Sequence, residues 1–282
     1  MAQFCDLHTH STYSDGTVTP TQLIRIAEAA GVAAVALTDH NTAAGLPEFL
    51  NAAAQSTVKA VPGVEFSTDY GQTELHILAL FVKPEYYAAV EELVGQMLLR
   101  KEQSNLDLIE ALVSLGMELD YGAIKALTPN GQVNRAVIAA EMVRKGYCET
   151  VKQAFSRYLS VSCGYFKPPR RLDALETIRF IKSIGAVAVL AHPFLNLDEA
   201  GLRQFLKEAI PVGLDAMEVY YAGYSAERTE LSERIVREFG LLASGGSDFH
   251  GNNKPDIWLG TGKGDLKLPM RLLEDLTRRK ND

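Results

Sequence analysis

Short apolar segments alternate with amphipathic segments over the first part of the chain and again over its last part. Short continuous apolar runs are typical of buried strands, whereas apolar positions three or four residues apart are typical of helices. The apolar runs predict seven strands, at residues 4–7, 32–38, 58–66, 75–82, 186–191, 216–220 and 241–245.

Helix-start and helix-stop signals lie between several of these strands. Thr19 matches a helix cap, Pro20 the first helical position and Gln22 the third position after the cap. Gly31 then ends this first helix. The same signals predict three further helices, at residues 47–54, 173–185 and 226–239.

The middle of the chain has helical periodicity and no strand pattern. Leu106, Ile109, Leu112 and Val113 are spaced to share one helix face. Further helices are predicted at residues 133–145 and 149–159. We therefore expect a helical insertion at residues 95–167 that interrupts a β/α domain made of residues 1–94 and 168–282, and we expect the insertion to cap the active site.

Strands that alternate with helices predict an α/β protein with a parallel sheet. The wholly apolar run at residues 32–37 agrees with this, because parallel strands are covered on both faces. Right-handed crossovers would curl such a sheet into a barrel or leave it open, and the pattern alone does not separate the two.

Composition and charge narrow the class of protein. Of 282 residues, 47% are hydrophobic and 22% are charged, as in ordinary globular domains, which excludes a disordered or fibrous chain. The net charge of −7, without a basic stripe, makes duplex nucleic acid an unexpected partner. We expect no signal peptide, no membrane segment and a cytoplasmic location with reduced cysteines. Trp258 and the three cysteines are interpreted as structural, and the oligomeric state is left open.

The histidines are placed unusually with respect to the predicted strands. Five of the six follow the end of a strand, whereas His76 begins one. The carboxyl ends of strands in a β/α barrel meet at one mouth, so these side chains would come together. Four carboxylates join them near strand ends, namely Asp15, Asp39, Glu65 and Asp248. The nine candidate metal ligands are His8, His10, His40, His76, His192, His250, Asp15, Glu65 and Asp248.

Imidazole and carboxylate are ligands of Mn²⁺, Fe²⁺ and Zn²⁺ alike. His8 and His10 are two residues apart, so on an extended strand they point to the same side. A single histidine is more often structural than a ligand, but the whole set favours a metal site. Because one catalytic ion takes only about three or four protein ligands, we expect two or three divalent ions.

Five motifs resemble those of the polymerase and histidinol phosphatase (PHP) family. They are Asp6-Leu7-His8-Thr9-His10-Ser11 with Ser14-Asp15-Gly16, Thr38-Asp39-His40, Gly63-Val64-Glu65, Ala191-His192-Pro193 and Gly246-Ser247-Asp248-Phe249-His250. The resemblance implies a distorted, TIM-like (β/α)7 barrel, the PHP fold, with a helical insertion of the kind found in stand-alone members.

The resemblance also implies an assignment of ligands to three ions. One ion would be held by His8, His10, Glu65 and Asp248, and Glu65 would bridge to a second held by His76 and His192. Asp15, His40 and His250 would hold the third. Asp6 and Asp39 are interpreted either as acceptors that orient the imidazoles or as strand-end caps.

The implied activity is that of a metal-dependent phosphoesterase. A metal-bridging hydroxide, held through Glu65 and Asp248, would attack phosphorus in line, with no side-chain nucleophile. The third ion and nearby cations would neutralise the phosphate oxygens. The general acid is not identified by the sequence.

Substrate contacts are expected from the insertion and from the point where the chain re-enters the barrel. Arg135 lies in a segment that resembles one in which related enzymes place a phosphate-binding arginine, although Val137 and Ala140 replace further polar residues expected there. Bidentate arginine suits phosphate recognition. The candidate substrate-binding residues are Arg135, Lys167, Arg170 and Arg171.

Three functions follow from the resemblance. The first is hydrolysis of a phosphate monoester of a small nucleotide, either a nucleoside 3′,5′-bisphosphate or the 5′ end of a short RNA. The second is histidinol phosphate phosphatase. The third is a non-catalytic PHP accessory module. Loss of some metal-ligand residues would favour this function, but every ligand position of the family is filled in this sequence.

Overall fold

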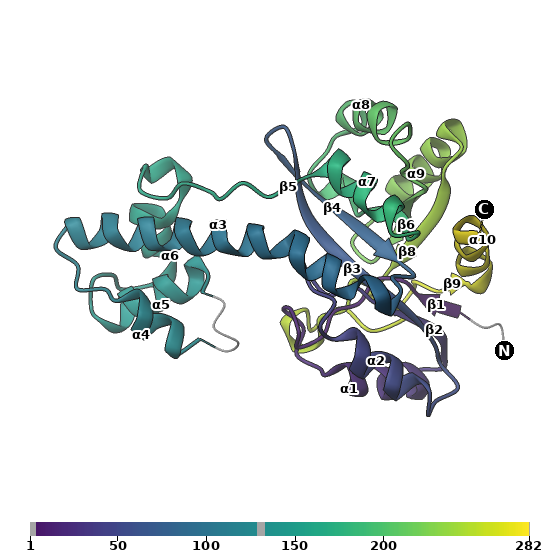
Figure 1. Ribbon diagram of the computed structural model, residues 1–282, viewed down its shortest axis with the longest axis horizontal. Helices are drawn as coiled ribbons and strands as arrows, with labels where there is room; N and C mark the ends of the chain where they lie inside the picture. Colours follow the sequence, from purple (N-terminus) through teal and green to yellow (C-terminus); the bar gives the residue numbers. More distant parts are fainter. Residues whose placement is uncertain (1–3, 129–132, 282) are drawn as a thin grey trace. The chain divides into compact units, whose positions relative to one another are not determined.

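The structure, a computed structural model, describes residues 4–128 and 133–281. The chain divides into two compact units (Figure 1). The first consists of Met1–Val94 and Arg171–Asp282, and the second of Gly95–Arg170. Among the described residues, no helix is both long enough and apolar enough to span a bilayer.

The first unit contains a nearly closed barrel-shaped sheet, which confirms the predicted α/β barrel. Its strands follow the order β8-β7-β6-β4-β3-β2-β1-β9, and β5 pairs with β3. Beyond the end of β1, the Leu7 amide donates to the Gly245 carbonyl of β8 at 3.3 Å, so the first strand of this order lies beside the segment that follows β1 and the sheet nearly closes. The strands are β1 (Phe4–Asp6), β2 (Val32–Leu37), β3 (Lys59–Tyr70), β4 (Thr73–Leu80), β5 (Leu172–Asp173), β6 (Val187–Ala191), β7 (Ala216–Tyr221), β8 (Leu242–Gly246) and β9 (Leu268–Pro269).

Strand β4 departs from the expected parallel order. It pairs antiparallel with β3 on one side and with β6 on the other. The strand predicted at 58–66 ends too early, because β3 extends to Tyr70, and the strand predicted at 75–82 begins two residues too late, because β4 begins at Thr73. Only Gly71 and Gln72 connect them, and a two-residue connection makes a hairpin, whereas a parallel pair needs a long crossover. The start of β4 therefore lies beside the ends of its neighbours.

Helices cover the outside of this sheet (Figure 1). The predicted capping box at the first helix is confirmed, since Thr19 accepts from the Gln22 amide and the Gln22 side chain accepts from the Thr19 amide. The last helix was not among those predicted. The helices of this unit are α1 (Pro20–Ala29), α2 (Leu46–Ala53), α7 (Ala174–Ser183), α8 (Glu199–Ala209), α9 (Ala226–Phe239) and α10 (Met270–Asn281), with short 3₁₀ turns η1 (Pro84–Tyr86), η5 (Pro193–Leu195) and η6 (Gly251–Asn253).

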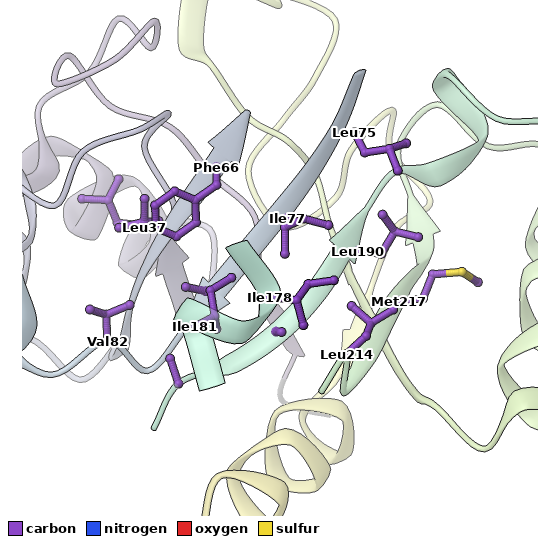
Figure 2. Close-up of a cluster of buried hydrophobic side chains, with 14 of the residues drawn as sticks. Leu37, Phe66, Leu75, Ile77, Val82, Ile178, Ile181, Leu190, Leu214 and Met217 are labelled. Atoms are coloured by element: carbon purple, nitrogen blue, oxygen red, sulfur yellow. The ribbon is translucent and has the colours of Figure 1, made fainter. Parts of the chain in front are cut away.

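The alternation of side chains along β3 and β4 aims the polar residues into the barrel. Ile77 and Phe66 point outward into the layer between sheet and helices, where Ile178 and Leu190 also lie (Figure 2). Leu78 belongs instead to the separate cluster inside the barrel. Because side chains alternate with a period of two, Glu65 and His76 share the inner face with Leu78.

The second unit is helical and has its own core. Helix α3 (Tyr87–Ser114) is one continuous helix of 28 residues that begins in the first unit. Leu108 and Leu112 face the core of the insertion, while Leu106 and Val113 are 38% and 45% exposed, so the predicted shared face is wrong for these two. The remaining elements are α4 (Tyr121–Ala126), α5 (Arg135–Arg144), α6 (Val151–Ala154), the π-helical turn η3 (Phe155–Leu159) and η4 (Val161–Cys163).

Candidate metal centre

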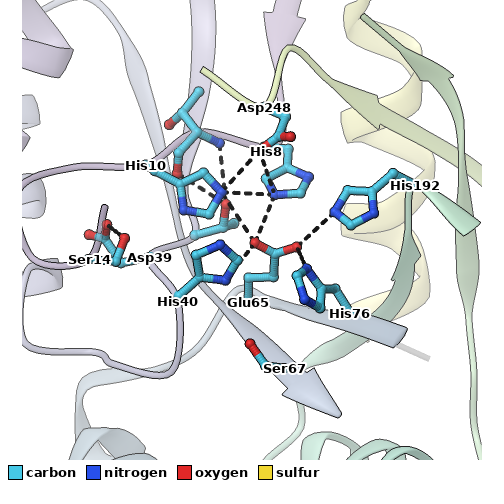
Figure 3. A network of polar contacts seen from close by, with 12 residues as sticks. His8, His10, Ser14, Asp39, His40, Glu65, Ser67, His76, His192 and Asp248 are labelled. Atoms are coloured by element: carbon cyan, nitrogen blue, oxygen red, sulfur yellow. Dashed lines mark hydrogen bonds and ion pairs between the residues drawn. The ribbon is translucent and has the colours of Figure 1, made fainter. Parts of the chain in front are cut away.

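Glu65 is the centre of the site. Its carboxylate is buried on the inner face of β3, and several imidazole rings point toward it (Figure 3). The Glu65 Oε1 atom lies 2.8 Å from His76 Nδ1 and 3.1 Å from His192 Nε2. The Oε2 atom lies 3.2 Å from His8 Nε2, 3.2 Å from His10 Nε2 and 3.1 Å from His40 Nδ1. One buried carboxylate thus faces five of the six histidines.

The reversed direction of β4 explains the position of His76. His76 lies in the first half of its strand, so a parallel β4 would have placed it away from the mouth, where strands end. Antiparallel pairing sets His76 opposite Ser67 of β3 and opposite Ala191 of β6, which immediately precedes His192. His76, the one histidine that begins a predicted strand, therefore joins the others because β3 and β4 form a hairpin.

His8 and His10 follow β1 and converge with Asp248. Their Nε2 atoms are 3.1 Å apart and both rings are fully buried. Asp248 Oδ1 lies 3.3 Å from His10 Nε2 and 3.7 Å from His8 Nε2. Two imidazole nitrogens and two carboxylates that converge in this way resemble the donor set of a transition-metal ion.

Asp15, His40 and His250 lie together on the more exposed side of the site. His250 Nε2 is 3.2 Å from Asp15 Oδ1, and His40 Nε2 is 3.8 Å from Asp15 Oδ2. The Asp15 side chain is 54% exposed, in contrast to 1% for Glu65. Solvent therefore reaches the site from the Asp15 side.

Three sets of side chains bring their donor atoms close enough together to hold an ion. They are His8, His10 and Glu65; His40, Glu65 and His76; and His10, Asp15, His40 and His250. These sets contain seven of the nine residues singled out in the sequence. The other two lie beside them, since His192 Nε2 is 3.1 Å from Glu65 Oε1 and Asp248 Oδ1 is 3.3 Å from His10 Nε2. The sets share His10 and His40, which the family resemblance assigned to one ion each.

Unpartnered buried atoms test whether the site fits a metal. His10 Nδ1, His40 Nδ1 and Glu65 Oε2 are buried and make no hydrogen bond of good geometry among the described residues, although ring nitrogens lie within 3.2 Å of Glu65 Oε2. Buried polar atoms are costly unless they are paired or bind an ion. Together with the imidazole and carboxylate donors, these atoms fit divalent metal ions.

The protonation of these groups reflects their mutual contacts. Burial alone would raise the pKa of Glu65, but His40, His8 and His76 hold it well below the ordinary value. Burial lowers the pKa of His10, but the nearby carboxylates of Asp248 and Glu65 outweigh it and raise the pKa to about 9. Burial lowers the pKa of His40 to about 3. A carboxylate that stays ionised among imidazoles provides the negative charge that a cation needs.

The backbone around the ligands is strained or closely packed. His192 and Asp248 have positive φ angles of 27° and 58°, and Asn41, next to His40, has 53°. Such values are uncommon for residues other than glycine and cost about 1–3 kcal/mol each. Gly246 lies so close to β1 that a Cβ atom there would be 2.3 Å from His8 Cβ and 2.5 Å from the His8 backbone nitrogen.

Two carboxylates that were not predicted from the sequence contact the imidazole rings of His8 and His76. Glu218 of β7 is buried, and its Oε1 atom lies 2.9 Å from His8 Nδ1. Glu74 Oε1 lies 3.3 Å from His76 Nε2, on the side of the ring away from Glu65. An acidic residue within the apolar run of β7 was the available signal for Glu218, because a buried acid needs a partner.

Two residues that were not predicted contact the outer oxygen of Asp248. The Tyr221 hydroxyl donates to Asp248 Oδ2 at 3.0 Å, and Lys254 Nζ lies 2.5 Å from the same atom. Burial and the Asp248 charge raise the pKa of Tyr221 above its ordinary value, so the hydroxyl stays protonated. No sequence motif marks either residue.

Asp6 and Asp39 do not contact imidazoles in the described part of the chain. Asp6 accepts from the Ser247 amide and hydroxyl and from the Gly260 amide. Asp39 accepts from the Ser11 amide and hydroxyl and from the Ser14 hydroxyl. The interpretation as imidazole-orienting groups is therefore wrong, and the alternative of strand-end caps describes them correctly.

The predicted phosphate contacts have different environments. Arg171 is ion-paired with Asp69 at 3.1 Å and with Glu74 at 2.7 Å. Within the insertion, Arg135 donates to the Leu159 carbonyl at 3.0 Å, and its guanidinium lies over the Phe166 ring. Lys167 and Arg170 are exposed. Trp258, interpreted above as structural, has a side chain that is 67% exposed.

Comparisons with known proteins show the family of the chain. The family model for the PHP domain matches residues 6–163. A 5′-3′ exoribonuclease from Haemophilus influenzae is 33% identical over 264 residues, which covers 93% of this chain and 94% of the relative. A 3′,5′-nucleoside bisphosphate phosphatase from Chromobacterium violaceum is 28% identical over 249 residues, covering 87% and 86%. A solved structure from Bifidobacterium adolescentis, assigned as a metal-dependent phosphoesterase, has a TM-score of 0.77 and 27% identity, covering 99% of this chain and 97% of that one.

A barrel mouth lined by histidines and carboxylates defines a metal-dependent hydrolase. The chain belongs to the PHP family and is a metal-dependent phosphoesterase.

Proposed function

We propose that the protein hydrolyses a phosphate monoester of a small nucleotide, either a nucleoside 3′,5′-bisphosphate or the 5′ end of a short RNA. The observation that carries the proposal is the convergence of nine imidazole and carboxylate side chains, with Glu65 at their centre, at the barrel mouth. The names of two relatives, an exoribonuclease and a nucleoside bisphosphate phosphatase, support a nucleotide as the substrate class.

Two or three ions of Mn²⁺, Fe²⁺ or Zn²⁺ are proposed to occupy the site. His8, His10, Glu65 and Asp248 would hold one, and Glu65 with His76 and His192 a second. Asp15, His40 and His250 would hold the third. Such ions, when bound, supply Lewis acidity and activate water as a nucleophile. Glu65, which faces five imidazoles, is the group that would link neighbouring ions.

The chain's own residues would bind and orient the phosphate. The ammonium group of Lys254 contacts the carboxylate of Asp248, a candidate metal ligand. Its side chain is 38% exposed, so an anion can reach it from solvent. A cation at this point would also offset the net charge of −7, which otherwise repels an anionic substrate. Further cations proposed to bind the substrate phosphate are Arg135, Lys167 and Arg170.

Removal of metal tests the chemistry. Treatment with EDTA followed by gel filtration should lower phosphate release from adenosine 3′,5′-bisphosphate by about a hundredfold or more, because the ions supply both the nucleophile and the charge stabilisation. Adding Mn²⁺ should restore the activity. Phosphate release that persists in protein shown to be metal-free would contradict the proposal.

Parallel substrates test the proposed specificity. The Mn²⁺-loaded protein is assayed with adenosine 3′,5′-bisphosphate, with a 5′-phosphorylated RNA oligonucleotide and with histidinol phosphate. Efficient turnover of either of the first two supports the nucleotide proposal. Turnover of histidinol phosphate alone would replace it with the alternative function that the sequence left open.

Replacing Lys254 tests the phosphate contact. The K254A variant should lose about 10- to 100-fold in kcat/KM, the factor expected when one hydrogen bond to a charged group is lost. K254R should retain most activity, since it keeps the charge. Bound metal, measured by elemental analysis, should be unchanged in both variants.

The exposed Lys263 provides the control, because K263A makes the same substitution outside the site. Equal kcat/KM values for K254A and K263A would show that Lys254 does not bind the substrate.

A further inference from the structure

Glu218 lies behind two of the candidate ligands at once. Its carboxylate is fully buried on β7. One oxygen, Oε1, lies 2.9 Å from Nδ1 of His8. The other, Oε2, accepts from the backbone amide of His192 at 2.7 Å. No other described carboxylate contacts both the ring of one candidate ligand and the backbone of another.

The donor and acceptor roles in this arrangement are fixed by chemistry. An ionised carboxylate only accepts hydrogen bonds, and a backbone amide only donates them. Oε1 therefore requires a proton on His8 Nδ1. When that nitrogen carries the proton, a neutral ring has its lone pair on Nε2.

The Nε2 side of the same ring faces the metal centre. His8 Nε2 lies 3.1 Å from His10 Nε2 and 3.2 Å from Glu65 Oε2, within one of the sets able to hold an ion. The proton that must leave when a metal binds is thus the one on Nε2, and the proton on Nδ1 can stay in its bond to Glu218.

We propose that Glu218 is a positioning residue that holds His8 in its Nδ1-protonated tautomer and so makes Nε2 the metal-binding nitrogen. The same carboxylate anchors the strained backbone of His192 through its second oxygen. This inference rests on the proposed function, in which His8 holds an ion.

The proposal explains why a carboxylate is needed at this position. Glutamine has the same shape, but it offers one oxygen and one NH₂ group. If its oxygen accepts from the His192 amide, its NH₂ group faces His8 Nδ1 and can be satisfied only by the opposite tautomer, which protonates Nε2. If its oxygen faces His8, two donors meet at His192. No orientation of an amide serves both neighbours.

The test uses the full-length protein and the isosteric variant E218Q. We expect Zn²⁺ affinity, measured by calorimetry, to fall about 10- to 100-fold, the range found when a group that orients a metal ligand is lost. In ¹⁵N-histidine NMR spectra of the Zn²⁺-loaded wild type, His8 should show a protonated Nδ1 and a metal-bound Nε2. The fraction of E218Q that remains metal-free should contain the Nε2-protonated form of His8.

The matched control is E233Q. Glu233 accepts a hydrogen bond from the Tyr220 hydroxyl at 2.9 Å, and the glutamine oxygen can keep that bond. Zn²⁺ affinity should therefore be unchanged in E233Q. E218D, which retains the charge and both acceptors on a shorter side chain, should bind Zn²⁺ more tightly than E218Q.

A double-mutant cycle separates an action through His8 from general destabilisation. In the H8A background, E218Q should lower the remaining Zn²⁺ affinity by less than about threefold, because the two residues act as one unit. Equal losses in both backgrounds, or a wild-type His8 protonated at Nε2 in the Zn²⁺-loaded protein, would overturn the inference. A wild type that binds no Zn²⁺ would instead overturn the proposed function on which it rests.

Discussion

Replacing Glu65 with glutamine is expected to abolish phosphoesterase activity, with a loss in kcat/KM of about a thousandfold or more. The substitution keeps the shape of the side chain but removes the charge that five imidazoles face. An amide is a weak metal ligand, and its NH₂ group would point at ring nitrogens that must be free to bind ions. Bound Mn²⁺, counted by elemental analysis, should fall together with the activity.

The E91Q variant controls for the chemical change. Glu91 lies on α3 and accepts from the Thr42 hydroxyl and the Ala43 amide through Oε1, contacts that a glutamine oxygen can keep. E91Q should therefore retain both metal and activity. If E65Q also bound a full complement of Mn²⁺, the central role given to Glu65 would be wrong.

Replacing Gly246 with alanine is the second change with a large expected effect. The added methyl group would lie 2.3 Å from His8 Cβ and 2.5 Å from its backbone nitrogen, so β1 and β8 would have to separate. Forcing extra volume into such a contact costs about 3 kcal/mol, which lowers the melting temperature by about 6 °C or more in a domain of this size. Because His8 follows β1, metal binding should weaken as well.

The same substitution at Gly95 is expected to raise the stability of the protein instead of lowering it. It lies within α3, and nothing stands within 4 Å of the position that a Cβ atom would take. G95A should stabilise the protein by about 0.5–1 kcal/mol, since alanine is the better helix former. Thermal unfolding of the two variants side by side checks both expectations, and a G246A protein as stable as the wild type would contradict the close packing of β1 and β8.

Much of the site could be predicted because its residues follow strand ends. His10, His40, His192 and His250 lie just beyond apolar runs that are easy to recognise, and strand ends meet in a barrel. His76 could not be placed by that rule, because the rule assumes parallel strands. Its position depends on the two-residue turn between β3 and β4, and the sequence pattern ended both strands short of that turn.

The residues that surround the ligands were harder to predict. Glu218 and Lys254 contact His8 and Asp248 through side-chain geometry that depends on how separate strands and loops pack. The sequence separation of 210 positions between His8 and Glu218 allows any relative placement until the fold is known. Likewise, Arg171 appeared available for phosphate, and only the structure shows that Asp69 and Glu74 pair with it.

The left-handed backbone conformations at the site set a limit on how thermostable this protein can become. Glycine at Asn41, His192 or Asp248 would relieve about 1–3 kcal/mol of strain at each position. Each of these side chains is already in use, however. Asn41 exchanges two hydrogen bonds with Ser67, and the other two are candidate ligands. Selection or engineering for heat resistance would therefore have to work elsewhere in the chain, because relieving the strain at these three positions would remove side chains that the site uses.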